Sequence, residues 1–290
     1  MAARLPLKDQ FFTREKVELI AGEIERVDPA FRADEFAAAV VARFPELELK
    51  ARIDWIAICL ERSLPRDFRE AAGVLVRSLP APADPGLSDG DFGDFIYAPY
   101  AEYIGRRGCS AEDLEFSLAA LREITTRFSA EFAIRPFLDA FPDQVLATLL
   151  VWTEDEHYHV RRLCSEGTRP RLPWARNLTL PYDVGVPLLD RLFADPTRYV
   201  TRSVANHVND ISKKDPDLAL DTLERWRNSG QQRPREMRYV IRHAARTLVR
   251  ADHPRALDIV SSSLPGRHGR KMKSSWVQCS SRDVRLDKDA

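Results

Sequence analysis

Three short strings of this 290-residue chain place carboxylates beside cations or aromatic rings. In the first, RFSAEFAIRPF, Glu131 stands among apolar neighbours. If it faces inward, it is desolvated and its pKa is raised, unless a cation such as Arg135 pairs with it. Alternatively, Glu131 is an exposed residue of an amphipathic helix. The pattern alone leaves both possibilities open.

The second string follows Glu166 and reads GTRPRLPW. Gly167 fits a helix end, and two prolines then favour an extended loop that presents Arg169, Arg171 and Trp174. Two cations and an aromatic ring beside a carboxylate are hard to justify as packing, so the loop is a candidate site. The alternative is that Trp174 fills the core and the arginines pair with nearby acids.

The third string, SVANHVNDISKK, carries Asn206, Asn209 and Asp210 at spacings of three and four residues. Such spacings place side chains on one side of a helix, and the lysines that follow suit a helix C-terminus. Asp210 is either a polar residue of that terminus or part of the same surface as Glu166.

These strings lie in a chain whose hydrophobic pattern is helical almost throughout, with proline and glycine between the segments. The most informative feature is a repeat of 40 residues. It aligns Val160, Val200 and Val240, and an arginine follows each valine at the same distance: Arg162, Arg202 and Arg242. This spacing is typical of HEAT or armadillo-like arrays with two helices per unit. We therefore predict an all-α fold, a right-handed α-solenoid of HEAT-like repeats with an N-terminal helical cap.

The recurring arginines have two interpretations. Each could pair with an acid of the neighbouring unit, since Asp155 and Asp195 also recur at this spacing. Alternatively, the arginines line one concave surface that suits a phosphate backbone. Periodicity cannot separate the two.

Other classes of protein lose their usual sequence support. TEDEHYH, residues 153–159, has acids and histidines, but the histidines are two apart and the string is better explained as a solvated helix start than as a metal site. Neither phosphate-loop nor dinucleotide nor nucleophile-elbow motifs occur. The four cysteines include no Cys-x-x-Cys pair, and the longest uncharged apolar run has ten residues. We expect no metal, no cofactor, no membrane association and a cytoplasmic protein.

The net charge of zero conceals two unlike halves. Residues 1–120 hold 15 basic and 22 acidic side chains, a balance of −7, so residues 121–290 carry +7. The basic half contains the repeats, which keeps a nucleic-acid partner open.

At the three strings the sequence resembles the AlkC family of DNA alkylation repair glycosylases, relatives of the AlkD family with HEAT-like repeats. The resemblance runs from about Pro6 to Val260 and rests on these segments: PLKDQFF, RFSAEFAIRPFL, HVRRLCSEGTRPRLPW, YVTRSVANHVNDISK and IRHAARTLV. Some relatives carry an additional immunoglobulin-like C-terminal domain, for which we expect no room after Val260.

The resemblance implies a monofunctional enzyme that hydrolyses the N-glycosidic bond of cationic bases such as 3-methyladenine and 3-methylcytosine in double-stranded DNA, without base flipping. It implies that Glu131, Glu166, Trp174 and Asp210 lie at the lesion. The predicted DNA contacts are Arg135, Arg161, Arg162, Arg169, Arg171, Arg202, Asn206, Asn209, Lys213 and Arg242. A non-catalytic HEAT-repeat module that binds DNA or protein is the alternative.

We expect one domain over residues 1–260, with a helical N-terminal part to about 110 and repeats from about 111. Residues 261–290 are polar and basic, which predicts a disordered tail. The protein is expected to be a monomer.

Overall fold

The protein is built from helices. A computed structural model describes residues 6–84, 93–173 and 175–263. Within these ranges the regular structure consists of sixteen α-helices and two short 3-10 helices, beside one isolated bridge between Gly93 and Phe128. The predicted all-α class is confirmed. None of the described helices is both long and apolar enough to cross a membrane.

The first helices follow the apolar spacing of the sequence. Val17, Ile20 and Ile24 recur at helical intervals and have no exposed surface. The hydroxyl of Thr13 accepts the amide of Lys16 and so begins the second helix. The elements of this part are α1 (Leu7–Phe11), α2 (Arg14–Val27), α3 (Ala33–Val41), η1 (Phe44–Glu46), α4 (Leu49–Ser63), α5 (Phe68–Ser78) and η2 (Phe95–Tyr97).

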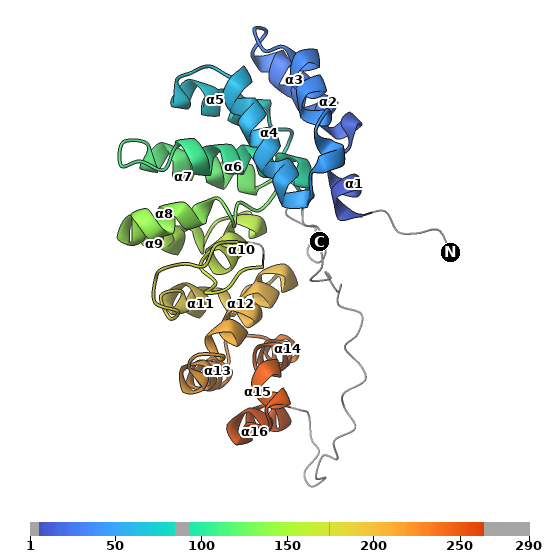
Figure 1. Ribbon diagram of the computed structural model, residues 1–290. Helices are drawn as coiled ribbons and strands as arrows, with labels where there is room; N and C mark the ends of the chain where they lie inside the picture. The colour runs from blue at the N-terminus through green and yellow to red at the C-terminus, as the bar shows by residue number, and fades with distance from the viewer. Residues whose placement is uncertain (1–5, 85–92, 174, 264–290) are drawn as a thin grey trace, which may run out of the picture.

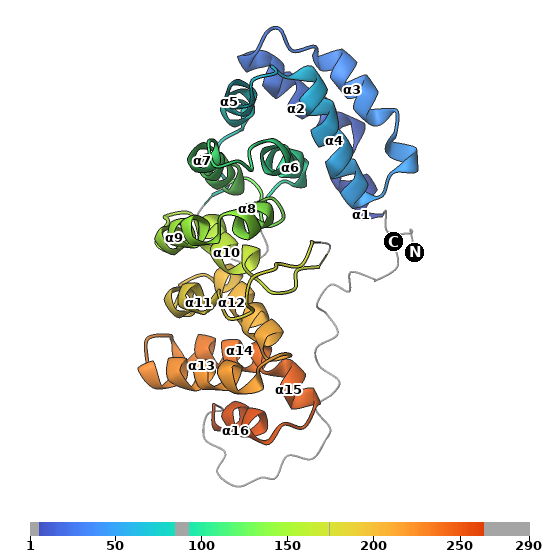
Figure 2. The same cartoon turned by 60° about the vertical axis from the view of Figure 1, so that its left-hand side comes forward.

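The remaining helices stack in layers below α5 (Figures 1 and 2). Both views place α6, α10, α12 and α14, which we call the even row, on one side, and α7, α9, α11 and α13, the odd row, on the other. The bounds are α6 (Ala98–Arg107), α7 (Leu114–Thr125), α8 (Ile134–Ala140), α9 (Pro142–Trp152), α10 (Tyr158–Gly167), α11 (Val186–Leu192), α12 (Arg198–Ile211), α13 (Pro216–Ser229), α14 (Pro234–Ala244), α15 (Arg246–Arg250) and α16 (Pro254–Ser262). The predicted tail lies outside the described residues from position 264 onward.

The 40-residue spacing of the sequence corresponds to successive layers. Val160, Val200 and Val240 lie in α10, α12 and α14, and each is completely buried. Their neighbours also pack between layers, since the rings of His159 and Tyr199 lie 5.3 Å apart. Residues that are 40 positions apart in the repeat therefore occupy equivalent core positions in successive layers.

Partly buried ion pairs join the layers. Asp155 accepts the backbone amide of His157 at 2.8 Å and the Nε of Arg122 at 2.6 Å. Asp195 repeats the arrangement one layer later, with the amide of Thr197 at 2.8 Å and the Nε of Arg161 at 2.6 Å. Each aspartate thus orders the start of one helix and holds an arginine of the preceding layer.

We call the pairs Arg122–Asp155 and Arg161–Asp195 the ladder. It corrects one expectation. Arg161 was predicted to contact DNA, but its guanidinium also donates to the carbonyls of Asp155 and Glu156, so each of its three nitrogens donates to a protein acceptor. The alternative of an arginine paired with the next repeat applies to Arg161.

Asp195 is expected to carry a large share of the stability of this region. Its side chain is 3% exposed, so Asp195→Ala leaves Arg161 and a helix start without their acceptor and should lower the free energy of unfolding by about 3 kcal/mol. The matched control is Asp217→Ala, whose side chain is 78% exposed and pairs with Arg255. In urea unfolding, the control should lose less than about 0.5 kcal/mol of the free energy of unfolding. Equal losses for both variants would contradict the structural role of the ladder.

Candidate active site

Three layers contribute carboxylates to one continuous chain of ion pairs. Arg162 Nη1 lies 2.8 Å from Glu131 Oε2, and its Nη2 lies 3.6 Å from Glu166 Oε1. Arg169 Nη1 lies 2.6 Å from the same oxygen of Glu166, and its Nη2 lies 2.8 Å from Asp210 Oδ2. We call these five residues the carboxylate–arginine network. Its three carboxylates are the three that the sequence singled out.

Local structure explains how α10 and the turn after it form the centre of the network. Arg162 and Glu166 are four residues apart and therefore share one side of the helix. The helix ends at Gly167, where a Cβ atom would come within 2.7 Å of Ile134 Cγ2. The small residue lets α8 pack closely, and the chain then turns back so that Arg169 reaches Glu166.

Glu166 is ionised in this environment. Burial alone would raise the pKa of its carboxyl group, but the charges of Arg162 and Arg169 and the hydroxyl of Ser203 outweigh burial and lower the pKa to about 2. Burial likewise opposes the charge of Arg169, yet Glu166 and Asp210 raise its pKa. Glu166 can therefore stabilise a cation but cannot serve as a proton donor near neutral pH.

Three further residues support the network and were not predicted. Ser203 Oγ donates to Glu166 Oε2 at 2.6 Å, and Ser129 Oγ accepts from Arg162 Nη1 at 3.1 Å. The guanidinium of Arg162 lies 4.6 Å from the centre of the Tyr199 ring. Both serines belong to the strings that carry the carboxylates, so their position in the sequence was the available signal.

Arg135 does not have its predicted role. Its side chain has no exposed surface, and it donates to the carbonyls of Gly167, Arg169 and Arg176 at 2.8 to 2.9 Å. Burial lowers its pKa to about 10. Arg135 therefore anchors the loop after α10 from inside, whereas Arg162 is the cation that pairs with Glu131.

Arg169 was expected to be presented by its loop, but it is 8% exposed and turned into the network. Asn209 is also buried, and its Oδ1 accepts the amide and hydroxyl of Thr247, which ties α12 to α15. Asn206 Oδ1 accepts Arg246 Nη2 at 3.0 Å and lies 2.8 Å from His243 Nε2. Asn209 therefore has a structural role in place of the predicted DNA contact, whereas the contact predicted for the half-buried Asn206 stays a prediction.

Four predicted DNA contacts keep accessible side chains. Arg171, Lys213 and Arg242 are exposed and Arg202 is half-buried. Lys213 Nζ also lies 2.8 Å from Asp210 Oδ1, which places a cation at the end of the network. Trp174 lies outside the described residues.

The histidines of the 153–159 string are buried, so the expected solvated helix start is wrong for them. His157 Nε2 lies 3.0 Å from the carbonyl of Ala83, and His159 Nδ1 lies 3.3 Å from that of Thr125. Both rings therefore have backbone partners. Within the part of the chain that the structure describes, no group of three or more His, Cys, Asp or Glu side chains is arranged to hold a metal ion.

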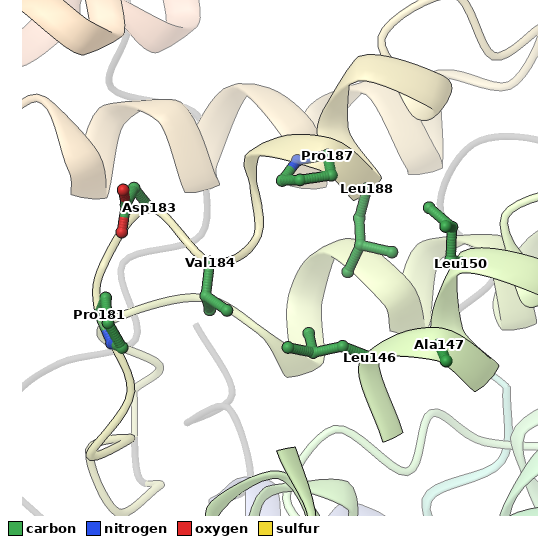
Figure 3. Close-up of a pocket in the computed structure, with 8 residues that line it drawn as sticks. All are labelled: Leu146, Ala147, Leu150, Pro181, Asp183, Val184, Pro187 and Leu188. Carbon is green, nitrogen blue, oxygen red and sulfur yellow. The ribbon is translucent and has the colours of Figure 1, made fainter. Parts of the chain in front are cut away.

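A cavity of about 420 Å³ lies elsewhere, between α9, α11 and the loop that precedes α11 (Figure 3). Its lining consists of Leu146, Ala147, Leu150, Pro181, Asp183, Val184, Pro187 and Leu188. The lining contains one charged side chain and no member of the carboxylate–arginine network, so this cavity is separate from the candidate site.

Comparison with known proteins identifies the family. No family model matches the chain. A solved structure, described as Pseudomonas fluorescens alkylpurine DNA glycosylase AlkC bound to DNA containing an abasic site analog, is 34% identical and superposes with a TM-score of 0.76. The match covers 89% of this chain and 68% of that one. This chain therefore has the same helical fold as that AlkC structure.

The chain belongs to the AlkC family. It is also 33% identical over 252 residues to the uncharacterized protein YhaZ of Bacillus subtilis (strain 168), a match over 86% of this chain and 66% of that protein. This chain thus spans about two thirds of the length of both relatives.

The depressed pKa of Glu166 predicts a pH-dependent contribution to stability. The pKa lies below its ordinary value of 4.5, so ionised Glu166 stabilises the fold above that pH, and the stabilisation is lost as pH falls towards 2. Glu166→Gln should therefore lower the free energy of unfolding by about 3 kcal/mol at pH 7. The difference in unfolding free energy between this variant and the unaltered protein should become smaller below about pH 5.

Urea titrations at pH 7 and pH 3 measure this difference in the free energy of unfolding. The exposed Glu156, changed to Gln, is the control and should show little difference at either pH. If Glu166→Gln lowers the free energy of unfolding equally at pH 7 and pH 3, the carboxylate is not held ionised by Arg162 and Arg169.

Proposed function

We propose that this protein is a monofunctional DNA glycosylase that hydrolyses the N-glycosidic bond of cationic N-alkylated bases, such as 3-methyladenine and 3-methylcytosine, in double-stranded DNA. The observation that carries the proposal is the convergence of Glu131, Glu166 and Asp210 in one network. Membership of the AlkC family supports it, because the related Pseudomonas protein is described as an alkylpurine DNA glycosylase.

The chemistry of such lesions suits ionised carboxylates. Alkylation gives the base a positive charge and makes it a good leaving group, so no strong acid is needed to protonate it. The remaining tasks are to stabilise a sugar that develops oxocarbenium character and to place a water molecule. A carboxylate whose pKa is about 2, as for Glu166, is suited to the first task. The weakened bond also allows chemistry without base flipping, which other base-modifying enzymes require.

In this proposal Glu166 and Glu131 stabilise the sugar cation and Asp210 positions the water. Trp174 contacts the lesion nucleotide. The accessible cations Arg171, Arg202, Lys213 and Arg242 bind phosphates. Arg162 and Arg169, originally expected at phosphates, hold the carboxylates in position.

The finer fold assignment belongs to the same proposal. We regard the stack as a right-handed α-solenoid of HEAT-like repeats from about residue 111 to 260, with residues up to about 110 as a helical cap and with a monomeric protein as the acting unit. The 40-residue register of α10, α12 and α14 supports the repeat assignment.

The test is release of free base from duplex DNA under single-turnover conditions. We expect release of 3-methyladenine and no release of the neutral base hypoxanthine, because only the cationic base leaves without protonation. Asp210→Asn and Glu166→Gln should each slow release by about 10²-fold or more, while Glu156→Gln should match the unaltered protein.

A non-catalytic binding module makes the opposite prediction. It would release no base above background, and Glu131→Ala and Asp210→Ala would leave its DNA affinity intact as long as circular dichroism shows a folded protein. That pair of results would overturn the proposed enzyme.

A further inference from the structure

An apolar patch on the odd row has no role in the proposed enzyme. At its centre is the cavity between α9 and α11, of about 420 Å³ (Figure 3). Val151 is 73% exposed and lies one helical turn after the lining residue Ala147. Tyr182 is 37% exposed and stands between the lining residues Pro181 and Asp183. Exposed apolar side chains around a cavity mark a site where another apolar group binds.

The surface around this cavity is acidic. The two segments that contain the lining residues, 142–160 and 177–190, include no Lys or Arg. Asp143, Glu154 and Asp183 are exposed on them, and Arg191 pairs with Glu154. An apolar cavity in an acidic surface suits an apolar side chain that is flanked by cations.

The acidic surface continues along α13 towards α16. Asp217 and Asp221 lie on successive turns of α13 and are 78% and 67% exposed. Arg255 of α16 pairs with one oxygen of each. One guanidinium thus faces two exposed carboxylates, which leaves a surplus of negative charge between α16 and the cavity.

The sequence after α16 contains a segment of complementary composition. Residues 264–276 include no acid and four cations, and they end in Trp276, the only Phe, Tyr or Trp among residues 264–290. The cations are Arg267, Arg270, Lys271 and Lys273. The segment therefore offers one large apolar side chain preceded by positive charge, which matches the cavity and the surface that leads to it.

This segment is long enough to reach the cavity. Arg227 Nη1 donates to Ser262 Oγ at 2.8 Å, so α16 ends beside the last turn of α13. The first turn of α13 lies next to the cavity, since the Tyr182 hydroxyl donates to Asp215 Oδ2 at 3.3 Å. The 14 residues of α13 extend about 21 Å, and one layer of packed helices adds about 10 Å. The 13 residues of 264–276 can span about 43 Å, which exceeds this path.

We propose that the cavity between α9 and α11 is the docking site for Trp276 of the same chain, with the cations before it along the acidic surface of α13. Attachment to α16 holds the indole at an effective concentration of about 1 mM or more. Even a weak apolar contact is then occupied, which favours this occupant over a separate molecule. The docking does not depend on whether the protein is a glycosylase.

The test measures crosslinking by bismaleimidoethane in the full chain, between an engineered cysteine and the native Cys279, three residues after Trp276. Ala147→Cys places the engineered thiol at the cavity, at an exposed position. The matched control is Asn228→Cys, which is also exposed and follows Arg227, the residue that contacts the end of α16. Each crosslink is quantified by mass spectrometry relative to the rate at which N-ethylmaleimide labels the engineered thiol.

We expect the Ala147→Cys crosslink to exceed the Asn228→Cys crosslink by at least about fivefold, because docking holds Cys279 within about 10 Å of the cavity. Addition of Trp276→Ala should remove this excess. A control crosslink that equals or exceeds the one at the cavity would overturn the proposal, because an undocked segment meets the nearer position at least as often.

Pro187→Cys, at a second exposed lining residue, provides the same comparison if Ala147→Cys does not fold. The size of the crosslinked species distinguishes the possible occupants. Crosslinked dimers whose yield falls on dilution would assign the cavity to a second copy and contradict docking within one chain. No crosslink at either lining position, although N-ethylmaleimide labels both, would also overturn the proposal and leave the cavity to a separate partner.

Discussion

The structure around the candidate site depends on the placement of Glu166 between two guanidinium groups. Glu166 Oε1 lies 2.6 Å from Arg169 and 3.6 Å from Arg162, and each arginine continues to a carboxylate of another layer. Without these cations, a carboxylate that is 5% exposed would be driven to its neutral form. The ion pairs of Arg162 and Arg169 thus fix the protonation state of Glu166 and the relative positions of the segments that carry Glu131 and Asp210.

Buried charge has different roles at two places in the stack. In the ladder, both oxygens of Asp155 and of Asp195 already accept from an arginine and from the start of a helix. In the network, carboxylates outnumber arginines, and Lys213 at its end is exposed. An arrangement of this kind holds anionic groups ready for a cationic ligand at the cost of their desolvation, which is a common property of catalytic sites.

Helical periodicity predicted the all-helical class and the register of the buried valines. The three carboxylates were singled out by their neighbours in three short strings, and the resemblance to the AlkC family implied that they lie at one site. It could not predict the partners of the arginines. Arg135 and Arg169 were assigned to DNA from their position in basic strings, yet one binds backbone carbonyls and the other binds Glu166 and Asp210. An arginine side chain is long enough to reach either solvent or a neighbouring layer, and spacing along the chain does not record which layer is near.

The central claim is that the carboxylates of the network stabilise a cationic sugar, and the most direct measurement compares two abasic-site analogues in the same duplex. One is a pyrrolidine, which is positively charged like the transition state, and the other is a neutral tetrahydrofuran. The account predicts that the protein binds the pyrrolidine duplex at least about tenfold more tightly, and that Glu166→Gln abolishes this preference. Equal affinity for the two duplexes would contradict it.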